Sequence, residues 1–493
     1  MQYLSTRDSA LRVSAQEAIV RGLAPQSGLF VPETFPKADL EGWKNLSYPE
    51  LAEKVLAGFL TDYSADFLHN ATAATYGAAF GGKAGRTVKV REGLYSLELW
   101  HGPTCAFKDY ALQLMPKLLV EAKKMLGRTE TTRILVATSG DTGKAALEGF
   151  KDVDKTKILV FYPVDGVSPM QKLQMTTQEG ENVAVCAIHG NFDDAQSAVK
   201  SIFTNDEIKA ELAKKNMMFS SANSINWGRL VPQIVYYFSA YADLCKMGQL
   251  QVGEPMNVVV PTGNFGNILA GYYAKHMGLP IKTMVCASNA NNVLTDFLKT
   301  GTYDRNRDFY ATTSPSMDIL ISSNLERLLY HMSGESDAAV RGWMTQLAEN
   351  GKYTVEPEVM AKIQNEFAAG YCDEAAVADT IHKTYTDQNY LCDTHTAVAV
   401  KVYRDYVAQT GDDLPTVIDS TASPYKFSKS VLTAVLDGKT PQLDEFDMVE
   451  ELHRVTGAAV PAPLAALKDK AVRFTQVCDR ENMSQMVFQL LNL

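Results

Sequence analysis

Residues 100 to 115 read Trp-His-Gly-Pro-Thr-Cys-Ala-Phe-Lys-Asp-Tyr-Ala-Leu-Gln-Leu-Met, and this segment is the most informative part of the sequence. The preceding run, 94–100, has the composition of a strand, and Gly-Pro-Thr at 102–104 predicts a turn before an apolar helix. Lys108 lies in the first turn of that helix. The residues at helical spacing after Lys108 are Leu112, Met115 and Leu119, so the helix has an apolar face where the lysine stands and is predicted to be buried.

The expected environment of Lys108 favours its neutral amine. Burial disfavours a charged lysine, and so does the positive end of a helix dipole. A neutral amine is the form that attacks aldehydes. A lone lysine at such a turn more often extends its amine to solvent, so the interpretation of Lys108 as a buried neutral amine needs support from other parts of the chain.

Composition limits the function classes. The 493 residues are 46% hydrophobic and 21% charged, which is typical of a globular protein of two or three domains. The net charge of −10 and the lack of a Lys/Arg block argue against nucleic-acid or anionic-membrane partners and favour a small-molecule ligand. Seven dispersed cysteines, no metal-ligand spacing, no signal-like apolar N-terminus and no membrane-length apolar run predict a cytoplasmic protein without a metal.

Short apolar runs alternate with helical patterns from about residue 130 onward. Such runs are typical of parallel strands that are covered on both faces, so the predicted class is α/β with mostly parallel open sheets flanked by helices. Ligands in such sheets bind beyond the carboxyl ends of strands. The runs are 134–137, 158–161, 183–186, 258–260, 284–286 and 414–419.

Two polar loops follow predicted strands at such positions. The loop Thr138-Ser139-Gly140-Asp141-Thr142 is either a capped strand-to-helix turn or a ligand-binding loop, and its spacing does not match a nucleotide phosphate loop. The loop Gly263-Asn264-Phe265-Gly266-Asn267 opens a predicted helix over 268–277. Its two glycines allow close approach of the backbone, and the N–H groups at a helix start suit a dianion such as phosphate.

Other polar segments are ambiguous. The Ser420-Thr421-Ala422 sequence follows the last predicted strand and could be an ordinary loop. The runs 221–229 and 314–324 are rich in Asn and Ser, and helix capping explains them as well as ligand binding does. The segment from Asp393 to Val398 is interpreted as a helix start rather than a catalytic dyad.

Taken together, these motifs resemble the threonine synthases of the bacterial and fungal type, which belong to the fold type II group of pyridoxal-phosphate enzymes. The resemblance is carried by His101-Gly102-Pro103-Thr104 through Lys108, by the Ser-Gly-Asp-Thr-Gly loop, by the 263–267 loop and by Ser-Thr-Ala at 420–422. The segment 21–32 also resembles their N-terminal domain. These motifs occur in the family's order and span nearly the whole chain.

The resemblance implies a domain organisation. A small α-rich N-terminal domain is expected over 1–90. A two-lobed catalytic core is expected over 91–465, with the smaller lobe at about 130–230. A C-terminal segment is expected over 466–493.

The resemblance also implies site residues. Lys108 is expected to be the catalytic residue that binds pyridoxal 5′-phosphate covalently, with the cofactor phosphate held by the 263–267 loop and its pyridine nitrogen by Thr421. The 138–142 loop is expected to bind the substrate carboxylate. Arg229 and Lys426 are candidates for the substrate phosphate, because a departing phosphate needs charge-assisted donors.

The implied reaction converts O-phospho-L-homoserine and water to L-threonine and phosphate, a carbon–oxygen lyase step that ends threonine biosynthesis. Two rival interpretations remain: another fold type II enzyme, such as a serine/threonine dehydratase or a β-replacing synthase, and an inactive relative that binds phosphorylated ligands or carries the cofactor. The N-terminal segment and Asp141, where many relatives have asparagine, argue against the first rival. The sequence leaves open whether the protein is a monomer or a homo-oligomer.

Overall fold

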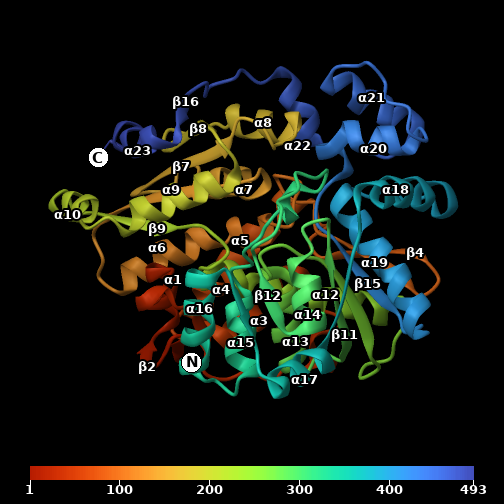
Figure 1. The fold of residues 1–493 in the computed structure, drawn as a ribbon, viewed down its shortest axis with the longest axis horizontal. Helices are drawn as coiled ribbons and strands as arrows, with labels where there is room; N and C mark the ends of the chain where they lie inside the picture. Colours follow the sequence, from red (N-terminus) through yellow and green to blue (C-terminus); the bar gives the residue numbers. More distant parts are fainter. Residues whose placement is uncertain (493) are drawn as a thin grey trace.

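The computed structural model describes residues 1–492 and contains two open sheets that lie side by side (Figure 1). The smaller sheet has five parallel strands in the order β16-β8-β7-β6-β9. Helices α7 (Asp141–Phe150), α8 (Pro169–Thr176) and α9 (Phe192–Thr204) accompany it. The strands are β6 (Thr131–Ala137), β7 (Thr156–Pro163), β8 (Val183–His189), β9 (Met217–Ser221) and β16 (Val477–Asp479).

The larger sheet has six strands in the order β14-β11-β10-β15-β5-β4. All neighbouring pairs are parallel except the β4–β5 pair, which is antiparallel. Every residue of β10 and β15 is buried, because helices cover both faces of this sheet. The strands are β4 (Arg86–Arg91), β5 (Leu94–Glu98), β10 (Met256–Pro261), β11 (Ile281–Ser288), β14 (Phe367–Tyr371) and β15 (Thr416–Ser420). The predicted α/β class with mostly parallel sheets is confirmed.

The prediction of a single helix after Lys108 is wrong, because the chain forms two helices there. Helix α5 covers Asp109–Leu112 and α6 covers Met115–Met125. Pro116 explains the break, since proline has no N–H to donate to the carbonyl of Leu112 and its ring crowds that carbonyl. The freed carbonyl instead meets α7 closely: a Cβ on Gly149 would lie 2.0 Å from the Leu112 oxygen.

The N-terminal region combines helices with a small antiparallel sheet that the sequence did not reveal. Strands β1 (Tyr3–Ser5), β2 (Asp8–Val13) and β3 (Phe30–Pro32) form the sheet, beside helices α1 (Ala15–Arg21), α3 (Tyr48–Phe59) and α4 (Ala65–Tyr76). Fully buried Trp227 packs against Tyr3 and Phe59, with ring centroids 5.2 and 5.7 Å away. This aromatic contact joins the N-terminal region to helix α11 (Trp227–Leu230) of the catalytic core.

The C-terminal segment links the two lobes. From α20 (Ser428–Val435) and α21 (Glu445–Thr456), which lie beside the larger lobe, the chain crosses to β16 at the edge of the smaller sheet and ends in α23 (Met483–Leu491) (Figure 1). Between α18 (Glu374–Gln388) and β15, helix α19 (Thr394–Thr410) packs against the larger sheet.

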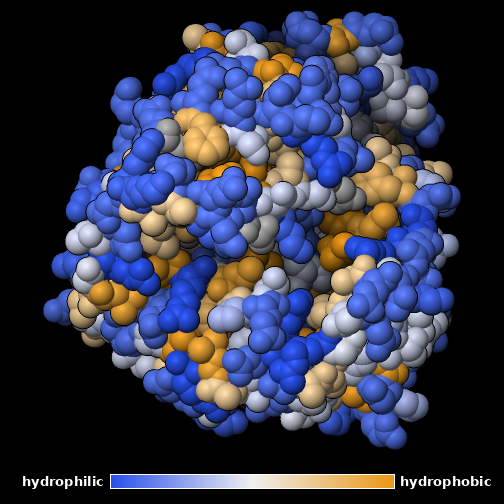
Figure 2. Space-filling view, turned by 60° about the vertical axis from the view of Figure 1, so that its left-hand side comes forward, coloured by the Kyte–Doolittle hydropathy of each residue, from blue (hydrophilic) through white to orange (hydrophobic). Residues whose placement is uncertain are grey.

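The surface view gives no sign of a continuous apolar face. Figure 2 shows a mostly hydrophilic surface on which hydrophobic residues are scattered in patches. Among residues 1–492, no helix combines the length and hydropathy needed to cross a bilayer, and no group of His, Cys, Asp and Glu could hold a metal ion. The seven cysteines are all free thiols.

Candidate functional site

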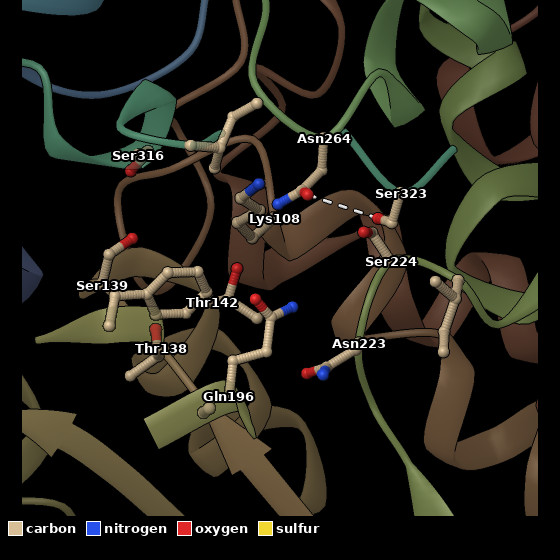
Figure 3. Close-up of a pocket in the computed structure, with 14 residues that line it drawn as sticks. Lys108, Thr138, Ser139, Thr142, Gln196, Asn223, Ser224, Asn264, Ser316 and Ser323 are labelled. Atoms are coloured by element: carbon tan, nitrogen blue, oxygen red, sulfur yellow. Dashed lines mark hydrogen bonds between the residues drawn. The ribbon is translucent and has the colours of Figure 1, made fainter. Parts of the chain in front are cut away.

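The carboxyl ends of both sheets meet at a pair of adjoining pockets. Loops after β5, β6, β9, β10 and β15 all contribute side chains, as expected for open α/β sheets. Lys108, Ser224, Asn264 and Ser316 line both pockets. Figure 3 shows Lys108 between the loop that carries Asn264 and the loop that carries Thr138 and Ser139.

The turn before Lys108 is held by a buried carboxylate. Asp109 accepts hydrogen bonds from the Thr104 N–H at 2.8 Å and the Thr104 hydroxyl at 2.7 Å. A Cβ at residue 102 would lie 2.5 Å from Asp109 Oδ2, so only glycine fits there. Burial raises the pKa of Asp109 to about 6, against the opposing effect of the Thr104 hydrogen bonds. These contacts fix the backbone from which the Lys108 side chain enters the pocket.

Lys108 has a strongly lowered pKa of about 7. Burial is the main cause, and the nearby positive charges of Arg229 and Lys426 act in the same direction, whereas Asp141 opposes them. The amine also lies 4.1 Å from the centre of the Phe107 ring. A much larger fraction of this amine is therefore neutral near pH 7 than for an exposed lysine, which agrees with the expectation from sequence.

This pKa gives a prediction for the free amine. The rate at which acetic anhydride labels Lys108 in the cofactor-free chain should rise with pH and level off above about pH 7, because only the neutral amine reacts. A lysine in a reference peptide, with a pKa of about 10.4, should still gain reactivity above pH 9. Peptide mass spectrometry after brief labelling measures both. A Lys108 labelling midpoint near that of the peptide would show that the amine is not desolvated.

The 263–267 loop forms a cradle at the start of helix α13 (Gly266–His276). Its outer carbonyl groups are bound from behind: Ser322 donates to Gly263 O at 2.7 Å, and the Asn324 side chain donates to Asn264 O at 2.9 Å. A Cβ on Gly263 would lie 2.8 Å from the carbonyl oxygen of Ser316, so a side chain there would displace that loop. The N–H groups of the first helical turn have no partners within the helix and can bind an anion.

The loop after β6 is built around Thr138, whose hydroxyl accepts the N–H groups of Gly140 and Gly143 at 3.0 and 2.9 Å. Thr138, Ser139 and Thr142 line the pocket (Figure 3). Helix α7 begins at Asp141. The Thr138 contacts support this start, because they satisfy N–H groups of the first turn.

Asp141 itself lines neither pocket and forms a buried ion pair. Its Oδ1 lies 2.5 Å from Lys426 Nζ and accepts a hydrogen bond from Gln171 at 2.8 Å. Lys426 is fully buried and also donates to Thr104 O at 3.2 Å. Burial acts to raise the pKa of Asp141, but the Lys426 ammonium outweighs it, so the pKa lies below its ordinary value.

Arg229 and His395 complete the wall near the cradle. Arg229 is buried, and its Nη1 donates to Ala222 O, while its Nε has no hydrogen-bond partner. Burial lowers the pKa of Arg229 to about 10, so the group stays charged at neutral pH. His395 accepts the Ser316 N–H at 3.2 Å through Nε2, and its Nδ1 lies 2.7 Å from Asp393.

Comparison with known proteins agrees with this geometry. Three family models match: "Threonine synthase N terminus" over residues 2–76, "Pyridoxal-phosphate dependent enzyme" over 84–370 and "Threonine synthase, C-terminal" over 396–487. Threonine synthase of Pseudomonas aeruginosa is 37% identical over 95% of this chain and 97% of its own length. The chain belongs to the threonine synthase family.

A solved structure and a further relative are also similar to this chain. The crystal structure titled as the PLP-bound threonine synthase of Brucella melitensis has a TM-score of 0.87, is 36% identical and covers all of both chains. Threonine synthase-like 1 of Homo sapiens is 41% identical over 88% of this chain. The chain spans 60% of the length of that human relative. The family membership confirms the fold type II assignment made from sequence.

The structure brings together many of the predicted site residues. Lys108, the 263–267 loop, Thr421 and Arg229 line a single pocket, and three residues of the 138–142 loop line the adjoining one. Gly140, Asp141 and Lys426 line neither of these two pockets. For Lys426 the reason is the ion pair with Asp141, which engages its amine.

Sequence reasoning missed several residues that line the pockets, among them Phe192, Gln196, Gln233 and His395. Phe192 and Gln196 come from α9, an amphipathic helix with no motif that marks it as part of a site. His395 comes from the segment interpreted as a helix start, and Asp393 does cap α19. The Asp-x-His spacing was a usable signal, because one carboxylate there both caps the helix and orients the imidazole.

Proposed function

We propose that this chain is a threonine synthase that converts O-phospho-L-homoserine and water to L-threonine and phosphate with pyridoxal 5′-phosphate as cofactor. The observation that carries the proposal is a shared pocket: Lys108 lines it together with a glycine-containing cradle at a helix start. A lysine amine with a pKa of about 7 suits an aldehyde, and the cradle suits that aldehyde's phosphate.

The residues present fit the cofactor. A side chain at position 263 would displace the Ser316 backbone, so this position of the cradle requires glycine. Thr421, at the end of β15, would offer its hydroxyl to the pyridine nitrogen. Lys108 would hold the cofactor and then carry protons at Cα and Cβ of the substrate. When bound, the cofactor supplies the sink for electrons released at Cα.

The remaining polar groups would bind the substrate. Thr138, Ser139 and Thr142 would accommodate its carboxylate. The Arg229 guanidinium keeps an unpartnered buried Nε, and a buried donor without a partner is costly. A phosphate oxygen would supply that partner, which supports Arg229 as a substrate ligand. Lys426 would position the 138–142 loop through its ion pair with Asp141.

A phosphate-release assay tests the proposal. Purified protein reconstituted with cofactor is incubated with O-phospho-L-homoserine, L-threonine or L-serine, and phosphate, threonine and 2-oxo acids are quantified. The expected result is equal release of phosphate and threonine from the phosphorylated substrate. Formation of 2-oxo acids from threonine or serine without phosphate release would instead identify a dehydratase.

A further inference from the structure

A fully buried carboxyl group lies behind the anion cradle. Asp419 is in β15, two residues before Thr421, and its side chain reaches α12 (Ile234–Lys246). The Tyr237 hydroxyl lies 2.9 Å from Asp419 Oδ2. The same hydroxyl lies 2.8 Å from Asn267 Oδ1 and 3.0 Å from the Asn267 carbonyl oxygen. Asp419 is thus connected to the cradle through one tyrosine.

The Tyr237 hydroxyl has one hydrogen but three oxygen neighbours at 2.8–3.0 Å, so it cannot donate to Asn267 and to an ionised Asp419 at the same time. The Tyr236 hydroxyl contacts Asn267 Oδ1 and the Gln233 side-chain oxygen. Asn267 Nδ2 is a buried donor without a partner in this arrangement. A proton on Asp419 would donate to Tyr237 and leave the Tyr237 hydrogen for Asn267.

The other carboxyl oxygen leads to the same conclusion. Asp419 Oδ1 is buried and has no hydrogen-bond partner, which is a costly situation for an ionised carboxylate and a milder one for a neutral acid. Burial raises the pKa of Asp419 to about 7, although Tyr237 and Asn267 oppose the shift. Free acid and carboxylate therefore coexist near neutral pH.

Few charged or titratable groups among the described residues surround Asp419. Helix α12 contributes Tyr236 and Tyr237, whose pKa values burial raises well above the ordinary value, so both stay neutral. Strand β5 contributes Glu98, opposite Ser420 and 2.8 Å from His101. Helix α19 contributes His395 to the pocket wall. The cations that line the same pocket are Lys108 and Arg229.

We propose that Asp419 is a positioning residue that is protonated when the cradle holds an anion, so that anion binding is coupled to proton uptake by this carboxyl group. An ionised Asp419 would put a negative charge directly behind the N–H groups that bind the anion. The neutral acid removes that repulsion. It donates to Tyr237, whose own hydrogen is then free to fix Asn267 at the helix start. The inference rests on the proposed function only through the cradle and needs no turnover.

Sulfate is a suitable probe because it remains a dianion between pH 6 and 8, unlike phosphate. The cofactor-free full-length chain is used with Lys108→Ala, so that residue 108 does not titrate. Isothermal titration calorimetry at pH 6, 7 and 8 gives the sulfate Kd. Repeating the pH 7 titration in two buffers of different ionisation enthalpy gives the number of protons taken up.

The inference predicts that sulfate binding weakens by up to about tenfold from pH 6 to pH 8, with uptake of about half a proton per sulfate at pH 7. Asp419→Asn in the same background should bind with no proton uptake and no pH dependence. His395→Gln, which removes the imidazole that lines the same pocket, serves as the matched control and should retain the uptake.

Other outcomes separate the two proposals. Sulfate binding that is independent of pH in the parent, or proton uptake that is lost in His395→Gln, would overturn the role of Asp419 while leaving the cradle intact. Absence of sulfate binding would overturn the cradle itself and the role of Asp419 with it. The parent and His395→Gln titrations stand even if Asp419→Asn does not fold.

Discussion

Replacing Lys108 by alanine is expected to lower the rate of threonine formation by about 10³-fold or more, because this one side chain is proposed both to hold the cofactor and to carry protons at the substrate. Lys108 is the only lysine among the residues that line the two described pockets. The loss should appear in kcat, together with loss of the visible absorbance of covalently bound cofactor. Phosphate release and absorbance spectra of the purified variant measure both effects.

Lys117→Ala is the matched control. Lys117 is partly buried in α6, its amine donates to Gln113 O at 3.0 Å, and it lies outside both pockets. This variant should keep the absorbance and nearly all of the activity. A Lys108→Ala enzyme with a tenth or more of the parental rate would contradict the role of Lys108.

Replacing Lys426 by methionine is expected to reduce the free energy of unfolding by about 3–5 kcal/mol, because it leaves Asp141 as an unpaired charge in the interior. Both members of the pair are almost inaccessible to solvent, and the two charged atoms are 2.5 Å apart. Denaturant midpoints for parent and variant measure the effect. The pKa of Asp141 lies below its ordinary value, so the stabilisation is present above about pH 3.9 and is lost as the pH falls below it.

The double variant Asp141→Asn/Lys426→Met separates charge from packing. Without either charge, much of the lost stability should return, since no buried ion remains uncompensated. The corresponding single variant Asp141→Asn completes the cycle. A loss below about 1 kcal/mol for Lys426→Met would mean that solvent reaches the pair.

The sequence predicted local structure near the site well. Lys108, Gly263 and Thr421 each follow an apolar strand, and the carboxyl ends of parallel strands meet at one edge of a sheet. Strand periodicity and the turn residues place each of them after a strand, and the resemblance to the family implied that they share one site. The roles assigned to these residues stay predictions, as do the domain boundaries and the cytoplasmic location.

Contacts between segments distant in sequence could not be predicted in the same way. The pairing of Asp141 with Lys426 depends on how the two lobes meet, and no local pattern records it. Strand β14 was missed because Phe-Ala-Ala-Gly-Tyr is a weak strand sequence; it is the edge strand of the larger sheet, and a Cβ on Gly370 would lie 2.9 Å from Val402. Pro116 indicates a break before α6, but the apolar pattern continues on both sides of it and therefore predicts a single helix.

The covalent role of Lys108 is tested by reducing the protein with borohydride after loading it with pyridoxal 5′-phosphate and then mapping the modified peptide. We expect one cofactor per chain, attached to Lys108, with the visible absorbance lost on reduction. Attachment at another lysine, or no attachment, would contradict this role.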